Sequence, residues 1–169
     1  IDAKVYEFKK EIIFVKDGDQ GTNGTTYILT IRPSNDDNTK LSGFQPLRYF
    51  NGQWQDSLRL RAYVYRDGEE INGTELDNSK YELTYNWSGI NVSYTSVSSN
   101  SPVAIVKGNT VPSEKGLCAK AQVNIKDKIN DKQVELYAFY PLDVIITEDK
   151  DEKNKFDLFM YIFNEILKI

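Results

Sequence analysis

The sequence predicts an all-β protein, an antiparallel β-sandwich of about eight strands followed by a C-terminal amphipathic helix. Three observations lead to this fold class. Apolar and polar residues alternate in short runs along the chain, which is the pattern of half-buried strands. Clusters of Gly, Asn, Asp and Pro separate these runs and indicate turns. No helical period occurs before residue 148, which favours an antiparallel sandwich over alternating strands and helices.

The N-terminal part of the chain predicts two short strands, a loop and a longer strand. Residues 5–8 and 10–16 are rich in β-forming side chains. Residues 17–24 carry glycine at every third position among polar residues, and the tolerance of glycine for positive φ favours a loop. Residues 25–32 alternate cleanly and predict a strand that Pro33 ends.

Residues 58–66 have the clearest strand pattern in the chain. One face carries apolar residues that we expect to point into the core: Leu58, Leu60, Ala62 and Val64. The other face carries residues that we expect to be solvent-exposed: Arg59, Arg61, Tyr63 and Tyr65. The run leads into Asp67-Gly68, a pair favoured in tight hairpin turns, and residues 69–72 are the expected return strand.

The second half of the chain predicts further strands at residues 81–87, 90–97, 102–107, 117–126, 133–141 and 142–146. Ser88-Gly89 is expected to separate the first two, and extended loops are expected at 34–56 and 88–116. The 117–126 strand should turn inward the side chains of Leu117, Ala119, Ala121, Val123 and Ile125. Cys118, in the same strand, is expected to be a small buried residue.

Beyond the sandwich, residues 152–168 predict an amphipathic helix. Its apolar stripe consists of Phe156, Phe159, Met160, Phe163, Ile166 and Leu167. Such a stripe needs cover from water, so we expect a docking helix that packs on another domain or subunit.

The predicted organisation has three parts. Residues 1–24 form an N-terminal strand and a glycine-rich lead-in, residues 25–147 the sandwich, and residues 148–169 a charged linker with the helix. The chain begins without Met and ends within an apolar run. We therefore expect it to be part of a longer protein.

Composition argues against catalysis. The 169-residue chain has no histidine, the common proton carrier near neutral pH, and only one cysteine. Asp17-Gly-Asp19 begins like a calcium loop, but Gly21 stands where a third oxygen ligand belongs. The pattern also places no pair of carboxylates for glycoside hydrolysis. We therefore expect no enzyme activity, no catalytic or metal-binding residue and no cofactor.

Charge and hydropathy limit the partners. The net charge of −4 opposes general attraction to nucleic acid. No apolar run reaches the roughly 18 residues needed to cross a bilayer. We expect neither nucleic-acid binding nor membrane insertion.

Aromatic residues of an irregular segment are the candidates for ligand or partner contact. Tyr49, Phe50 and Trp54 lie among Gly and Pro residues instead of in an alternating run. Exposed aromatic rings fill protein interfaces and stack on sugars. Two kinds of partner remain open: other protein subunits, or a cell-surface glycan.

Four runs resemble bacterial and phage immunoglobulin-like (Ig-like) domains: residues 27–34, 60–68, 81–88 and 134–142. Residues 16–27 are similar to the glycine-rich lead-in of such domains in virion proteins. The resemblance covers about residues 10–147 and implies an Ig-like sandwich with no catalytic residues to carry over.

This resemblance also implies a function and a location. We expect a non-catalytic structural module of a larger assembly, most readily a phage tail, fibre or capsid-associated protein. The alternative is a carbohydrate-binding or adhesin module of a bacterial surface protein. Location in a virion, or at the cell surface of a bacterium, follows from these two readings.

Overall fold

The computed structural model describes residues 4–6, 12–14, 24–43, 45–73, 76–96, 100–112 and 116–147. This part of the chain is all-β, with strands joined by turns and no helix. The predicted fold class is therefore confirmed at that level. The predicted helix, with its docking residues from Phe156 to Leu167, lies outside the described residues.

The strands form three sheets, which are named here sheets A, B and C. Sheet A contains, in spatial order, β1 (Lys4–Tyr6), β13 (Val144–Thr147), β4 (Leu47–Phe50) and β5 (Gln53–Trp54). Sheet B contains β2 (Ile12–Phe14), β12 (Lys132–Leu142), β11 (Leu117–Asp127) and β8 (Tyr81–Ile90). Sheet C contains β3 (Tyr27–Pro33), β6 (Leu58–Arg66), β10 (Val103–Gly108) and β9 (Val92–Ser96), with β7 (Glu69–Glu70) beside β6.

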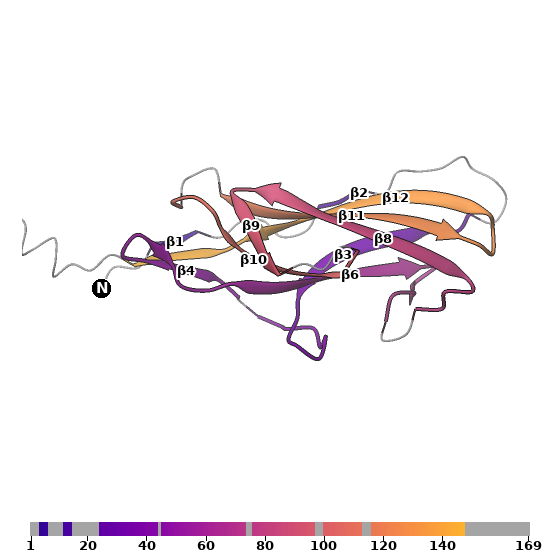
Figure 1. The fold of residues 1–169 in the computed structure, drawn as a ribbon, viewed down its shortest axis with the longest axis horizontal. Helices are drawn as coiled ribbons and strands as arrows, with labels where there is room; N and C mark the ends of the chain where they lie inside the picture. Colours follow the sequence, from indigo (N-terminus) through magenta and orange to yellow (C-terminus); the bar gives the residue numbers. More distant parts are fainter. Residues whose placement is uncertain are drawn as a thin grey trace, which may run out of the picture.

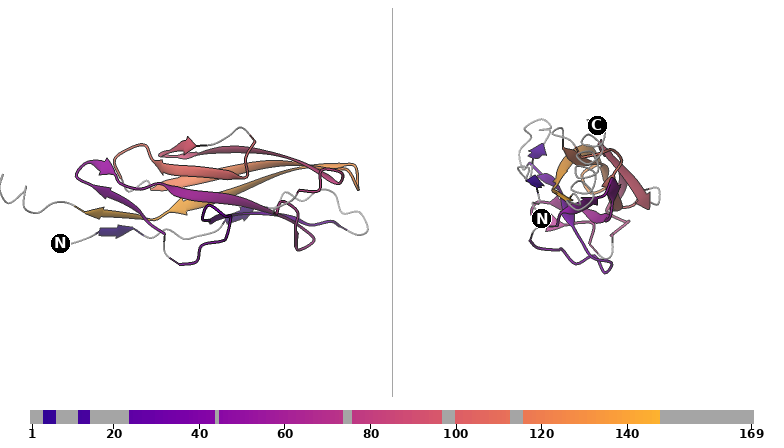
Figure 2. Two further views of the ribbon diagram at one scale, coloured as in Figure 1. Left: turned by 60° about the horizontal axis from the view of Figure 1, so that its bottom comes forward. Right: turned by 90° about the vertical axis from the view of Figure 1, so that its left-hand side faces the viewer.

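Among the described residues, all strand pairs are antiparallel except β13 with β4, which run parallel. The body is elongated, and the long strands of sheets B and C run along it (Figure 1). Sheet A lies at one end, where β1 and β4 are seen in Figure 1. A second view shows the strands of sheets B and C as two layers (Figure 2).

The core lies mainly between sheets B and C. It contains the alternating residues of their long strands, together with Leu47 of β4 and Val144 of β13. The predicted inward residues of β6 and of β11 are all buried, so both predictions are confirmed. Alternation works here because each strand has one face turned to the opposite sheet.

The prediction that the outer face of β6 is exposed is wrong: Arg59 and Tyr65 are half-buried, and the other two residues are buried. Arg61 and Tyr63 keep only 4% and 2% of their surface exposed. Segments outside the sheets cover this face: the Lys40 ammonium lies 4.5 Å from the centroid of the Tyr63 ring, and Arg61 donates a 3.1 Å hydrogen bond to the carbonyl of Gly73. The two side chains therefore form a second, polar layer beneath loops.

Gly89 does not mark a turn, contrary to the prediction for Ser88-Gly89. Strand β8 continues to Ile90, and the chain turns at Asn91, where φ is +56°. A Cβ on Gly89 would lie 2.5 Å from Cγ2 of Val92, so the glycine permits close approach of neighbouring strands. The hairpin predicted at Asp67-Gly68 is confirmed, with φ values of +50° and +88° between β6 and β7.

A buried carboxylate joins the two layers at the end opposite sheet A. Asp127, at the end of β11, has no exposed surface. Its Oδ2 accepts hydrogen bonds from the hydroxyl of Tyr27, from Nε of Arg66 at 3.1 Å and from Nδ2 of Asn130 at 3.1 Å. Its Oδ1 accepts the amide of Ile129 at 2.8 Å. One side chain thus connects β3, β6 and the β11–β12 turn.

The ionisation of this group follows from its partners. Burial opposes ionisation of Asp127, but the hydrogen bonds from Tyr27 and the turn amides, together with the charge of Arg66, outweigh it and lower the pKa. Burial and the hydrogen bond to Asp127 raise the pKa of Tyr27 to about 12. The carboxylate is therefore charged and the phenol neutral over the whole ordinary pH range.

A second buried polar group, the side chain of Asn72, forms hydrogen bonds with backbone groups at the edge of β6. Its Oδ1 accepts the amide of Val64 at 2.7 Å, and its Nδ2 donates to the carbonyl of Ala62 at 2.8 Å. These groups lie between the part of β6 paired with β10 and the part paired with β7. The same Nδ2 donates to the hydroxyl of Tyr85 on β8, 2.9 Å away, which links sheets C and B.

We predict that Asp127→Ala lowers the free energy of unfolding by about 3 kcal/mol, because it leaves buried donors unpaired. Urea denaturation at neutral pH measures the change. Asp36→Ala is the matched control, since that side chain is fully exposed, and its effect should stay within about 0.5 kcal/mol. Equal losses in the two variants would contradict the role assigned to Asp127.

Stability should also fall at alkaline pH. Burial raises the pKa values of Tyr27, Tyr85 and Tyr94 to about 12, whereas an unfolded tyrosine ionises near pH 10. A raised native pKa contributes stability below pH 10 that is lost as the pH rises from about 10 to 12. Denaturant midpoints and phenolate absorbance, measured across this range, check the prediction. Tyr27→Phe should make the loss less steep, and an unchanged midpoint up to pH 12 would contradict it.

Candidate functional site

The aromatic candidates lie on a hairpin of sheet A that sequence reasoning treated as irregular. Strands β4 and β5 pair antiparallel, with Tyr49 opposite Trp54 and Phe50 opposite Gln53. The residues of the turn, Asn51 and Gly52, have positive φ values of +46° and +77°. Positive φ suits glycine and asparagine, which explains how this sequence makes a tight hairpin turn.

An ion pair holds the base of this hairpin. Nε of Arg48 lies 2.6 Å from Oδ2 of Asp56, and Nη2 of Arg48 lies 2.7 Å from Oδ1. The hydrogen bonds from Arg48 lower the pKa of Asp56, and those to Asp56 raise the pKa of Arg48. This two-point contact connects β4 to the segment that follows β5.

Trp54 is packed against the rest of the molecule. Its ring lies against Gly108 at the end of β10, where a Cβ would come within 2.5 Å of Nε1. The Nε1 group donates a 2.9 Å hydrogen bond to the carbonyl of Thr110. The Tyr49 ring meets the Trp54 ring edge-on, with centroids 5.1 Å apart. The three predicted contact residues therefore have different surroundings: Trp54 and Tyr49 are half-buried, and Phe50 is 38% exposed.

Beside this hairpin is a hollow of about 340 Å³, named here the end groove. Its lining consists of Tyr49, Asn51, Gly52, Val111, Pro112, Ile146 and Thr147. Val111 is 68% exposed, although it is apolar. The parallel pairing of β13 with β4 places Ile146 opposite Tyr49. The groove surface is thus partly polar and partly apolar, with Asn51 and Thr147 beside Val111 and Ile146.

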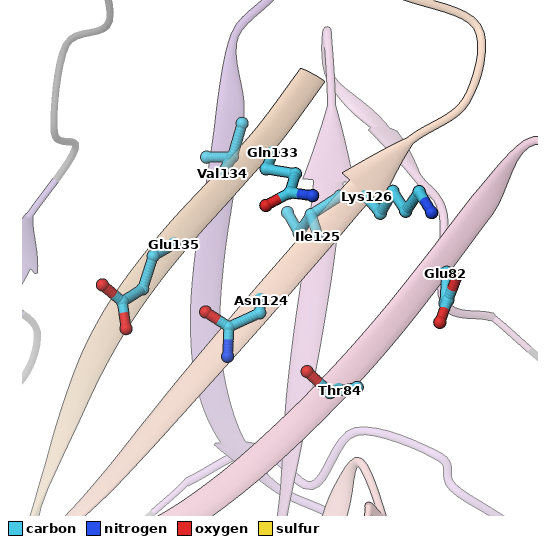
Figure 3. Close-up of a pocket in the computed structure, with 8 residues that line it drawn as sticks. All are labelled: Glu82, Thr84, Asn124, Ile125, Lys126, Gln133, Val134 and Glu135. Carbon is cyan, nitrogen blue, oxygen red and sulfur yellow. The ribbon is translucent and has the colours of Figure 1, made fainter. Parts of the chain in front are cut away.

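A second hollow, of about 280 Å³, lies on β8, β11 and β12 of sheet B (Figure 3). Its lining consists of Glu82, Thr84, Asn124, Ile125, Lys126, Gln133, Val134 and Glu135. The polar members are exposed and stand side by side across the three strands: Thr84, Asn124 and Glu135 share one row, and Glu82, Lys126 and Gln133 the next. This is the solvent face of an antiparallel sheet, with both signs of charge.

Aromatic residues continue this face of sheet B. The Lys120 ammonium lies 4.4 Å from the centroid of the Tyr137 ring, at a distance typical of cation–π contacts. A hydrogen bond to Glu135 raises the pKa of the Tyr137 hydroxyl. Cys118 lies farther along the same face and is half-buried, with its thiol pKa raised by burial. It is therefore in a strand as predicted, but less buried than expected.

Sequence reasoning named the hairpin side of the end groove and missed the other side. Val111, Pro112, Ile146 and Thr147 are about 60 to 100 residues from Tyr49 and reach it through loop packing and a parallel strand pair. The sequence carried one usable signal, the apolar run that became β13. Nothing in the sequence indicated that this run would pair with β4.

Among the residues that the structure describes, no helix is long and apolar enough to cross a membrane. In the same part of the chain, His, Cys, Asp and Glu form no group of three or more that could hold a metal ion. Comparison with protein families, curated proteins and solved structures gives no match.

The contact between Gly108 and Trp54 predicts the effect of adding one methyl group. Gly108→Ala should displace the Trp54 ring, lower the free energy of unfolding by about 1–3 kcal/mol and shift Trp54 emission to longer wavelength. Fluorescence-monitored urea denaturation in a Trp87→Phe background measures both effects. Gly73→Ala is the control, because the nearest atom to its Cβ is 3.9 Å away. An unshifted emission in Gly108→Ala would contradict the packing described here.

Proposed function

We propose that this chain is a non-catalytic structural module of a larger assembly, of the kind found in virion and bacterial-surface proteins. It docks on a neighbouring subunit through the end of the body formed by sheet A. The partner to which we commit is a second copy of the chain. The observation that carries the proposal is the position of the end groove beside the paired strands β1 and β13.

The strand pairing explains why this end is suited to attachment. Strand β1 runs antiparallel to β13, and Lys4 stands opposite Ile146. The first and last described strands of the chain therefore lie side by side at one end of an elongated body (Figure 1). A module of this shape projects from the point where it is held, and contacts near that point position the rest.

The end groove offers surface that a partner can bury. Phe50 is exposed next to it, and its lining includes the exposed Val111 together with Tyr49, Pro112 and Ile146. Full burial of an exposed Phe or Val side chain is worth about 1.5–3 kcal/mol, and the half-buried residues contribute less. An exposed apolar patch of this kind supports a protein interface.

Glycan binding through Tyr49, Phe50 and Trp54 is the weaker proposal. A sugar-stacking tryptophan needs a free ring face, and the Trp54 ring packs on Gly108 while its Nε1 is bonded to Thr110. Of the three aromatic side chains, this leaves the more exposed Phe50 and the Tyr49 edge of the groove. These two support contact with an apolar protein surface better than stacking on a sugar.

Two glutamate substitutions test the docking end. Val111→Glu should weaken self-association of the full chain by about tenfold or more, because it puts a charge into the buried contact. Sedimentation equilibrium over micromolar to millimolar concentrations measures the dissociation constant. Ile129→Glu is the matched control: Ile129 is 53% exposed in the β11–β12 turn, away from sheet A, and should leave association unchanged.

Two results would overturn the proposal. One is a wild-type chain that remains monomeric at millimolar concentration. The other is an equal effect of the substitutions at Val111 and Ile129.

A further inference from the structure

The chain contains three Asn-Gly pairs, at 23–24, 51–52 and 72–73. The side-chain amide of an asparagine can be attacked by the backbone nitrogen of the next residue, and glycine hinders this attack least because it has no Cβ. Asn23 lies outside the described residues. The structure places the other two pairs in opposite surroundings, so it separates two sites that are alike in sequence.

Asn51 is open to this reaction. It stands at the tip of the β4–β5 hairpin, and both Asn51 and Gly52 are exposed. A Cβ on Gly52 would have no atom within 4 Å. In the part of the chain that the structure describes, the Asn51 side chain has no hydrogen-bond partner. The turn has to relax before the Gly52 nitrogen reaches the side chain, and an exposed hairpin tip does so at low cost.

Asn72 is protected from the same reaction. It is only 4% exposed. Its side chain makes three hydrogen bonds, with the amide of Val64 at 2.7 Å, the carbonyl of Ala62 at 2.8 Å and the hydroxyl of Tyr85 at 2.9 Å. All three have to open before the amide can react, which slows the reaction by about a hundredfold.

We propose that Asn51 is a site of spontaneous deamidation in the folded chain, and that the carboxylate formed there weakens docking at the end groove. The backbone nitrogen of Gly52 gives its proton to solvent base and attacks Cγ of Asn51. The new N–Cγ bond closes a succinimide ring while the Cγ–Nδ2 bond breaks, and the leaving nitrogen takes a proton from solvent and departs as ammonia. Water then opens the ring to aspartate or isoaspartate, so that one water is consumed for each ammonia released.

The effect on docking rests on the function proposed above and follows from the position of Asn51. Asn51 lines the end groove together with Val111 and Ile146. Deamidation replaces a neutral amide with a negative charge, and a charge buried in a contact without a partner is costly. Isoaspartate also adds a methylene group to the backbone of the turn that pairs Phe50 with Gln53. The ability of a chain to dock should therefore decline with its age.

Peptide mapping by mass spectrometry tests the site. The full chain is incubated at micromolar concentration and neutral pH, and each Asn-Gly pair is followed by the mass gained when NH₂ is replaced by OH. In the native chain, Asn51 should react about a hundredfold faster than Asn72. The chain unfolded in guanidinium chloride gives the reference, in which the ratio of the two rates should be close to one. A native ratio no larger than the unfolded ratio would overturn the proposed site.

Two aspartate variants test the effect on docking. Asn51→Asp carries the charge of the product from the start and should weaken self-association by about tenfold or more, as measured by sedimentation equilibrium. Asn78→Asp is the matched control, because it adds the same charge at an exposed position. The carbonyl of Asn78 accepts a hydrogen bond from Lys128, just beyond Asp127, so this position is at the end opposite sheet A. The control should leave association unchanged.

The outcomes are distinguishable from those of the docking test. An equal effect of Asn51→Asp and Asn78→Asp overturns the effect of deamidation on docking. A wild-type chain that remains monomeric at millimolar concentration removes the docking function and this effect together. The site itself is decided by the two native rates, which do not depend on association.

Discussion

The carboxylate of Asp127 is the interaction on which the arrangement of the two main sheets depends. Apolar contacts between sheets B and C favour burial, but they are not directional and tolerate sliding. A buried charge tolerates much less sliding of the sheets, because the cost of its desolvation has to be offset by hydrogen bonds of defined geometry. Tyr27, Arg66 and the amides after Asp127 provide these bonds from three parts of the chain. The layers are thereby held in one relative position.

The two ends of the body differ because of this constraint. At the Asp127 end, the polar groups of the turn and of neighbouring strands bind one another. Asn72 adds a second link between the layers farther along β6. At the other end, sheet A gathers four short strands from distant parts of the sequence and leaves Phe50 and Val111 exposed. The first end sets the shape of the body, and the second offers the contacts.

The sequence correctly predicted the inward faces of those strands that alternate because one face contacts the opposite sheet. Strands β6 and β11 alternate because one face meets the opposite sheet, and their inward residues were identified correctly. The prediction failed where a second layer covered the outer face. Arg61 and Tyr63 look like solvent-exposed residues in the sequence, and only packing of the segments around Lys40 and Gly73 buries them. No local pattern encodes that cover.

The candidate site was predictable to a similar extent. Tyr49, Phe50 and Trp54 were identified by type, but the hairpin that divides their roles depends on positive φ values at Asn51 and Gly52. The groove itself depends on the parallel pair of β13 with β4. Parallel neighbours can be far apart in sequence, so alternation within a strand contains no information about them.

The end groove and the pair of β1 with β13 meet at the last residues of β13. Ile146 stands opposite Lys4 of β1 on one side and opposite Tyr49 of β4 on the other. A second copy docked at the groove would therefore lie beside the β1–β13 pair as well as beside the β4–β5 hairpin. The proposed docking contact would then form around one strand, β13, which pairs with β1 on one side and with β4 on the other.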